Sequence, residues 1–486
     1  MRVLRSIQNW FTPHRRERSL VALCFILGAA LFIGGRSLPE VRAGEQVESD
    51  LYDDLKTFTD VLSVVQRDYV REVPSRKLVE GAIKGMLTTL DPHSGYLDPN
   101  FYKDLQVQTK GEFGGLGIEI TIRDGLLIVV SPMEGSPAEK AGLKTGDAIV
   151  KIDGKFAKEF SLVDAVKTLR GPKGSVVTLS IHRKGNGDLI DIPVVRDNIM
   201  VRSVRHRLLG EGFGYVRISQ FMEKTTEDLR AALSDLRKQQ GGQEIRGLVL
   251  DLRNNPGGLL TQAIGVSDTF LREGVIVYTD GRVVKQKQRY FAHEGGTEAE
   301  YPIIAVVNGG SASAAEIVAG ALKDHGRALV LGTQTFGKGS VQTITPLENG
   351  GAITLTTALY YTKSGRSIQV TGVKPDIEME QPAPAKEEVP DQQRSPIGQM
   401  REGDLPGAIL NPNGQGDPTK RSNKPAVGEV KTTSDQPVID PMKEELPSFL
   451  GRDPQLQRAL DLLKTFNIFK APREDGMTVA ALSVEP

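Results

Sequence analysis

The chain has 486 residues, which is long enough for more than one domain. It carries 61 basic and 61 acidic side chains, and this zero net charge gives no electrostatic reason to expect nucleic acid as a partner. The single cysteine, Cys24, excludes a disulfide framework and a cysteine-based zinc site within one chain, and we expect neither a metal nor a cofactor.

The N-terminus has the pattern of an export signal. A basic stretch, residues 1–18, precedes an apolar run at residues 19–35. This order is typical of a signal peptide or a short signal anchor. The small residues at 43–44 give only a weak cleavage site, so both interpretations stay open. We expect the rest of the chain outside the cytoplasm, in the periplasm, either secreted or anchored to the inner membrane.

Residues 48–100 are predicted to be helical. Leu51, Leu55, Phe58 and Leu62 recur at helical spacing. This region either packs on the main body or forms a dimerisation arm, and the sequence does not choose between them. The turn that follows contains His93, and a histidine in such a turn more often caps or packs than reacts.

Residues 104–196 show a different pattern, with short strands and two short helices. Alternating apolar residues predict strands at 114–120, 126–130, 148–152 and 176–182, and the helices are expected near 136–142 and 162–169. This density of short strands indicates a small, partly open β-barrel-like module.

Residues 197–380 alternate strands and helices. Apolar strands are predicted at 214–218, 247–252, 303–307, 328–332, 341–345 and 352–360, with helices at 226–239, 260–271 and 314–323. Continuous apolar strands alternating with helices are typical of an α/β core whose sheet is covered on both faces. The predicted fold class is therefore α/β, with an inserted β-barrel-like domain and an N-terminal helical region.

The C-terminal part of the chain changes composition. Residues 381–445 are rich in Pro, Gln, Glu, Asn and Gly and are predicted to be a disordered linker. A helix is expected within residues 446–470, where Leu456, Leu460 and Leu463 share one face. This apolar stripe predicts docking on the body or on another subunit.

Two glycine-rich segments each follow an apolar strand, at residues 251–258 and 308–316. Ligands of open α/β sheets bind beyond the carboxyl ends of strands, so both segments lie where a site is expected. Ser313 opens a predicted helix, where free N–H groups and the helix dipole can stabilise an oxyanion. The alternative is that Ser313 is an ordinary N-cap.

A serine nucleophile requires a base, and no histidine of this chain has a recognisable triad context. Lys338 lies between two glycines beside Phe336, and a buried lysine can act as a base because burial lowers its pKa. An exposed turn lysine is the alternative. Gln342 could orient the ammonium, although a glutamine on a strand face usually contacts water.

Four segments together resemble the carboxyl-terminal processing proteases, also called tail-specific proteases. They are Gly111–Ile120, Asp251–Gly258, Ser311–Glu316 and Thr335–Gln342, in this order, and the resemblance extends from about residue 52 to 379. It implies a serine peptidase core with a crotonase/ClpP-like fold, formed by residues 197–380 with 48–100. It also implies a PDZ domain at residues 104–196.

The resemblance assigns roles position by position. It implies Ser313 as nucleophile, Lys338 as general base and Gln342 as the residue that positions the lysine. The remaining implied sites are the oxyanion-hole N–H groups of Gly258 and Ala314, the PDZ peptide-binding loop Gly115, Leu116, Gly117 and Ile118, and Arg170 as a sensor of PDZ position.

We therefore expect an exported endopeptidase that recognises the C-terminal tails of proteins through its PDZ domain and cleaves near them. The expected partners are peptide and protein substrates, with an adaptor protein as a further candidate. We also expect a homo-oligomer formed through the N- or C-terminal helices. One alternative is a catalytically silent PDZ scaffold on a protease-like body, and another is an acyl-CoA-handling enzyme.

Overall fold

The computed structural model describes residues 43–123, 125–185, 188–381, 401–414 and 445–470. The predicted basic N-terminus and the apolar run at 19–35 lie outside these ranges. Within them, no helix is both long and apolar enough to span a membrane. The chain divides into two compact units, with the boundary between residues 82 and 83.

The first unit is helical, as predicted. Helix α2 spans Ala43–Asp68, and α3 begins in this unit and spans Ser75–Thr88. Apolar side chains of α2 remain exposed, including Leu51, Leu55 and Phe58. The described part of α2 therefore carries an apolar stripe with little cover in the single chain.

After the last part of α3, the second unit continues with the short strand β1 (Gly95–Leu97) and helix α4 (Pro99–Lys110). The side chain of Asp98 caps the first turn of α4, accepting from the N–H groups of Asn100 and Phe101. The chain then enters and leaves the inserted module through two antiparallel strands, β2 (Glu112–Gly115) and β9 (Asp197–Met200), whose register pairs Gly115 with Asp197.

The inserted module is a five-strand path with its own apolar core. Its sheet order is β3-β4-β5-β7-β8, and β6 pairs with β5. The predicted strands and helices are present, and β8 is an additional strand that contains Pro193. Proline is tolerated there because β8 lies at the sheet edge. The bounds are β3 Ile118–Arg123, β4 Leu126–Pro132, β5 Ala148–Ile152, β6 Lys155–Phe156, β7 Val176–His182, β8 Ile190–Val195, α5 Pro137–Lys140 and α6 Leu162–Leu169.

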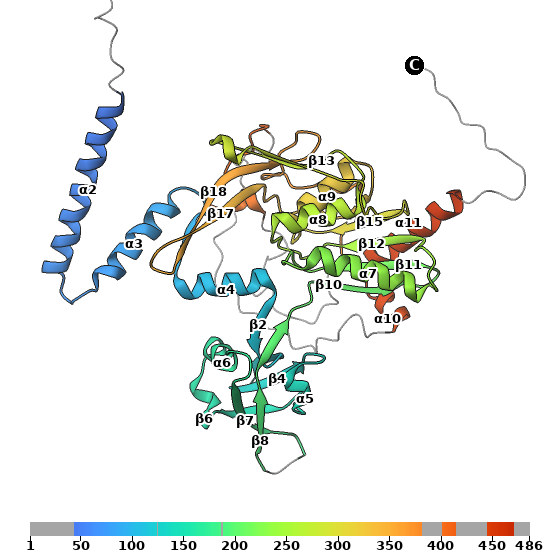
Figure 1. Cartoon of the computed structure of the whole chain (residues 1–486), viewed down its shortest axis with the longest axis horizontal. Coiled ribbons are helices and arrows are strands. Elements are labelled where there is room, and N and C mark those ends of the chain that lie inside the picture. The colour runs from blue at the N-terminus through green and yellow to red at the C-terminus, as the bar shows by residue number, and fades with distance from the viewer. Residues whose placement is uncertain (1–42, 124, 186–187, 382–400, 415–444, 471–486) are drawn as a thin grey trace, which may run out of the picture. The chain divides into compact units, whose positions relative to one another are not determined.

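The main body is built on a six-stranded sheet in the order β10-β11-β12-β15-β16-β19. Figure 1 labels four of these strands, β10, β11, β12 and β15. All neighbouring strands are parallel except β10 and β11. The strands are β10 Val204–Leu208, β11 Phe213–Ile218, β12 Gly247–Asp251, β15 Ile303–Val307, β16 Leu329–Gly332 and β19 Ile377–Glu378.

Helices cover both faces of this sheet. One apolar cluster joins alternate strand residues to α7 (Thr225–Gln239), α8 (Leu260–Phe270) and α9 (Ala314–Asp324). A second cluster joins the other strand residues to α10 (Leu446–Gly451) and α11 (Pro454–Lys470). Strands buried on both sides need apolar residues at every position, which explains the continuous apolar runs.

A second sheet completes the body, with the order β1-β18-β13-β14 and β17 paired to β18. The strands β17 (Ser340–Pro346) and β18 (Ala352–Tyr361) were predicted, whereas β13 (Val275–Gly281) and β14 (Gln288–Phe291) were not. Strand β17 begins two residues after Lys338, so this sheet fixes the direction in which the lysine loop leaves the site.

The C-terminal region is more structured than its composition predicted. Residues 401–414, inside the range predicted as a disordered linker, pack against the body, and Glu402 is fully buried there. Leu456, Leu460 and Leu463 of α11 are buried on this chain's own sheet, which is one of the two alternatives the sequence left open.

Candidate active site

Two loops meet at the carboxyl ends of β12 and β15, because these parallel strands are neighbours. The side chains of Asn254 and Asn308 tie the loops together, with Asn308 Oδ1 accepting from the Asn254 N–H at 2.9 Å and Asn308 Nδ2 donating to Asn254 Oδ1 at 2.9 Å. The Ser311 hydroxyl donates to the Leu252 carbonyl at 2.8 Å. The two glycine-rich segments therefore form one site.

Ser313 stands at the start of α9 with an unusual backbone, φ 53° and ψ −113°. This region is costly for a residue with a side chain and is found where the surroundings enforce it, often at functional sites. Its side chain makes no cap hydrogen bond. The hydroxyl is therefore not used as an N-cap, which was the alternative to a chemical role.

Gly257 lies close to Ser313, and Gly258 lies close to the backbone of Phe221. A Cβ on Gly257 would lie 2.8 Å from the Ser313 Cβ, and one on Gly258 would lie 2.1 Å from the Phe221 carbonyl oxygen. Only glycine fits at either position. The N–H groups of Gly258 and Ala314 have no hydrogen-bond acceptor among the described residues. These are the two donors that the resemblance assigns to an oxyanion hole.

Glu316 joins the serine segment to the lysine segment. Its fully buried carboxylate accepts through Oε2 from the N–H groups of Ser313 at 2.8 Å and Lys338 at 2.9 Å. Its Oε1 accepts from the Gly337 N–H at 2.7 Å and the Thr335 hydroxyl at 2.5 Å. Because Ser313 and Lys338 share one carboxylate oxygen, they are adjacent in the fold although 25 positions separate them in the sequence.

Lys338 is half-buried, and this burial lowers the pKa of its ammonium below its ordinary value. The negative charges of Glu402, Asp91 and Glu316 act in the opposite direction and limit the fall. A lysine with a lowered pKa is more readily neutral near neutral pH, as a general base must be. The structure thus disfavours the alternative of an exposed turn lysine.

Gln342 lies on β17, beyond the lysine. Its amide nitrogen donates to the Ser340 hydroxyl at 2.9 Å and to the Thr356 hydroxyl at 3.3 Å. Thr356 in turn donates to Asp91 at 3.1 Å. These contacts hold Gln342 in a polar network beside the lysine loop, and its role toward the Lys338 ammonium stays a prediction.

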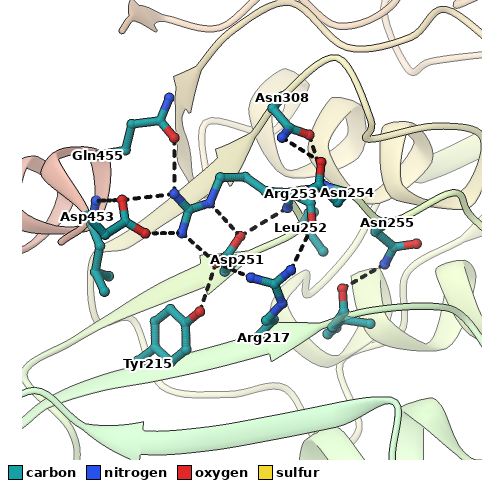
Figure 2. Close-up of polar contacts among 12 residues, drawn as sticks. Tyr215, Arg217, Asp251, Leu252, Arg253, Asn254, Asn255, Asn308, Asp453 and Gln455 are labelled. Carbon is teal, nitrogen blue, oxygen red and sulfur yellow. Dashed lines mark hydrogen bonds and ion pairs between the residues drawn. The ribbon is translucent and has the colours of Figure 1, made fainter. Parts of the chain in front are cut away.

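A buried ion-pair cluster supports the loop that carries Gly257 and Gly258 (Figure 2). The guanidinium of Arg253 binds the Asp251 carboxylate at 3.0 and 2.7 Å. Asp453 and Gln455, at the start of α11, bind the same guanidinium, Asp453 at 2.9 and 2.6 Å and Gln455 at 3.1 Å. Burial tends to raise the pKa of Asp251, but the charge and hydrogen bonds of Arg253 together with the charge of Arg217 outweigh burial, so the pKa is lowered. The start of the C-terminal helix is thereby fixed to Arg253, which precedes the loop that carries Gly257 and Gly258.

The predicted PDZ loop connects the entry strand to the module's sheet. Gly115 ends β2 and Ile118 begins β3, which is an edge strand with β4 as its only partner in the described sheet. An open strand edge is what peptide binding by strand addition requires. Arg170, at the end of α6, contacts Asp104 of α4 at 3.3 Å and lies over the Phe113 ring at 4.9 Å.

Several residues of the site were not found from the sequence. Glu316 had a local signal, because Ser-x-x-Glu at a helix start is the pattern of a capping box. Glu402 had none, since it follows a polar segment far from the site in the sequence. His93, expected to have a structural role, contacts Glu402 through Nε2 at 2.8 Å.

Comparisons with known proteins agree with this geometry. Residues 212–379 match Peptidase family S41, residues 104–182 match the PDZ domain, and residues 35–100 match the Activating protease CtpB N-terminal domain.

Three named proteins are similar to the chain. A carboxy-terminal-processing protease of Bartonella bacilliformis is 52% identical over 339 residues, 70% of this chain and 78% of that protein. The carboxy-terminal processing protease CtpB of Bacillus subtilis is 38% identical over 346 residues, 70% of this chain and 71% of that protein. A solved structure of a photosystem II D1 C-terminal processing protease is 32% identical and covers 66% of this chain and 92% of that chain, with a TM-score of 0.39.

The S41 match includes both glycine-rich loops and the lysine loop, so the class of the molecule is a serine peptidase, here with a PDZ domain inserted. The predicted fold class and enzyme class are confirmed. The chain is 52% identical to the Bartonella bacilliformis protease, and the aligned region covers 78% of that protein. The chain therefore belongs to the family of carboxy-terminal processing proteases.

Proposed function

We propose that this protein is an exported endopeptidase that cleaves proteins near their C-termini with a Ser313/Lys338 dyad. The observation that carries the dyad is Glu316, whose one carboxylate oxygen accepts from the backbone N–H groups of both residues. A buried acceptor shared by two segments fixes their relative position, and the proposed proton transfer requires in addition that Lys338 Nζ comes within hydrogen-bond reach of Ser313 Oγ.

In the proposed reaction, neutral Lys338 Nζ removes the proton from Ser313 Oγ as Oγ attacks the scissile carbonyl. The N–H groups of Gly258 and Ala314 stabilise the oxyanion of the tetrahedral intermediate. The peptide C–N bond then breaks, and the lysine ammonium gives its proton to the leaving amine. Water, activated by the same lysine, attacks the acyl-enzyme and releases the second product.

The PDZ domain is proposed to capture the substrate's C-terminal residues at the edge of β3. An extended peptide would add to this edge, and the backbone N–H groups of the loop Gly115, Leu116, Gly117 and Ile118 would bind its terminal carboxylate. Arg170 is proposed to report the position of the domain, since it connects α6 to α4 through Asp104. These contacts lie close to the strands through which the domain joins the body.

We also propose a periplasmic location, from the basic and apolar pattern of residues 1–35. A homo-oligomer is proposed through the exposed apolar stripe of α2, because such a stripe is typical of a surface that another chain covers. Light scattering of the full chain and of a variant with Leu55→Glu and Phe58→Glu tests this. A monomeric wild-type protein contradicts it.

The dyad is tested with the full chain and three variants. Ser313→Ala and Lys338→Ala are expected to lose hydrolysis of casein and labelling by a fluorophosphonate probe, while circular dichroism shows an unchanged fold. Lys363→Ala, which removes an exposed lysine outside the site, is the matched control and is expected to keep both activities. Turnover by the Lys338→Ala protein at the wild-type rate would exclude the lysine as the base.

The same assay addresses the alternatives. Failure of the wild-type protein to react with the probe, alone and with a C-terminal peptide added, supports a silent scaffold. Cleavage only after a periplasmic extract is added supports an adaptor, which can then be isolated from that extract.

A further inference from the structure

The segment 401–414 lies against the loop that carries Lys338. The N–H of Glu402 donates to the Phe336 carbonyl at 3.2 Å, and Arg401 Nη1 donates to Gln334 Oε1 at 2.8 Å. Further along, the Asn411 amide donates to the Gln369 carbonyl at 2.8 Å. This segment, which we call the tail segment, therefore contacts both the loop that carries Lys338 and the segment that carries Gln369.

The Glu402 side chain is the most deeply buried group of the tail segment. Its carboxylate is fully buried and binds His93 Nε2 at 2.8 Å and Gln369 Nε2 at 3.0 Å. Gln369 Oε1 accepts from the Gly339 N–H at 2.9 Å. Through its backbone and through Gln369, Glu402 thus holds the residues on both sides of Lys338.

Glu402 and Asn411 both bind Gln369, and the backbone of the next residue is strained. Val370 has φ 66°, a region where a β-branched residue is a rare outlier. Its N–H donates to the Gly337 carbonyl at 2.7 Å, and Gly403 of the tail segment lies against it, since a Cβ there would be 3.0 Å from Val370 Cγ1. Such a backbone persists only when its surroundings enforce it. The tail segment supplies part of that enforcement.

The negative charge of Glu402 has a second effect, which acts on the Lys338 ammonium. Glu402 acts on Lys338 together with Asp91 and Glu316, and the imidazole of His93 contacts Glu402. A carboxylate is rarely buried without partners, because its desolvation is costly. A buried acid in this place does more than cover the loop, since a leucine would cover it without that cost.

We propose that Glu402 is a positioning residue of the peptidase site: docked by the tail segment, its carboxylate fixes the Lys338 loop and sets the charge that the lysine meets. This proposal rests on the proposed role of Lys338 as the base. It assigns a part in the reaction to residues beyond the range that matches the S41 family.

The test is the pH dependence of Ser313 labelling by a fluorophosphonate probe, which requires no knowledge of the natural substrate. Glu402→Gln keeps the shape of the side chain and removes its charge. Without that charge the ammonium is less favoured, so the rising limb of the labelling rate is expected to move to lower pH by about 1 unit, the lower end of typical neighbouring-charge effects. Asp404→Asn, an exposed acid of the same segment, is the matched control and leaves the limb in place.

Glu402→Asp keeps the charge and shortens its reach to His93 and Gln369. Its labelling rate is expected to rise over the same pH range as that of the wild type but to reach a lower maximum. This result would separate the effect of the Glu402 charge from the effect of its contacts with His93 and Gln369. All variants are also measured with His93→Gln, because His93 is itself titratable. An unmoved or upward-moved limb in Glu402→Gln overturns the proposal. A wild-type labelling profile in Lys338→Ala instead overturns the dyad on which it rests.

Discussion

At the scale of single residues, the site depends on one acidic side chain that makes four hydrogen bonds. Glu316 accepts from the serine segment and from the lysine segment, so its removal would free both. Burial raises the pKa of Glu316 to about 7, while the hydrogen bonds from Thr335, Gly337, Ser313 and Lys338 act to lower it. The protonation of this group therefore changes within the range in which enzymes usually work.

This pKa predicts a pH-dependent stability. A carboxyl group whose pKa is higher in the folded than in the unfolded protein stabilises the fold at low pH, and this contribution is lost as pH rises through about 7. Relative to Glu316→Gln, which does not titrate, the wild-type free energy of unfolding is expected to decrease by on the order of 3 kcal/mol between pH 5 and 8. Urea unfolding at both pH values measures this difference. A constant difference would contradict the prediction.

At the scale of elements, helix α11 has two roles. Its apolar face covers the second side of the main sheet, and Asp453 and Gln455 at its start bind Arg253 (Figure 2). Arg253 directly precedes the loop that carries Gly257 and Gly258. The position of a C-terminal helix therefore affects a loop that contributes to the site.

Asp453→Ala tests this connection. It removes two charge-assisted hydrogen bonds from the buried Arg253 guanidinium, which keeps Asp251 and Gln455 as partners, and we expect a loss of about 2 kcal/mol in the free energy of unfolding, in line with hydrogen bonds to charged groups. Ser313 labelling should slow as well. Asp461→Ala, on the exposed side of α11, is the control and should change neither quantity. Equal effects of the two substitutions would remove the special role of Asp453.

The elements also show how much the sequence could predict. Strands β12 and β15 and helices α6 and α9 were predicted within a residue or two, because their apolar periodicity is strong and their caps are local. Strands β13 and β14 were missed, since their pattern depends on cross-strand partners. The tail segment was predicted as disordered because its polar side chains, such as Glu402 and Asn411, find partners only in the folded body.

The site divides in the same way. Ser313, Lys338, Gly258 and Ala314 were assigned from motifs and lie in one site. Glu316 could have been assigned from its spacing to Ser313. Glu402 and Asp453 could not, because nothing local in the sequence indicates which distant loop a buried acid will contact.

At the scale of the whole molecule, the PDZ domain is an insertion that begins and ends at one two-stranded antiparallel sheet, formed by β2 and β9. Strands β2 and β9 pair Gly115 with Asp197, so the chain leaves the domain where it entered. Among the described residues of 118–195, none contributes a strand to the body's own sheets. The main body is therefore expected to fold without the domain.

Replacing residues 116–196 with a short glycine-serine turn tests this. The shortened protein should keep Ser313 labelling, and should lose its preference for a peptide with a free C-terminal carboxylate over the amidated peptide. Gly117→Val is a smaller change, because a Cβ at this position, where φ is 72°, would lie 2.5 Å from the Ser136 Cβ. It should weaken the same preference. An unchanged preference in both variants would show that the tail is recognised elsewhere.

The docking of α11 has a consequence for the order in which the molecule is made. The helices that cover the second face of the main sheet, and the Asp453 that binds Arg253, are translated after every strand of that sheet. A nascent chain therefore has a bare apolar face and an unsupported loop until residue 470 has emerged. The site is therefore expected to be complete only after residues 446–470 have been translated.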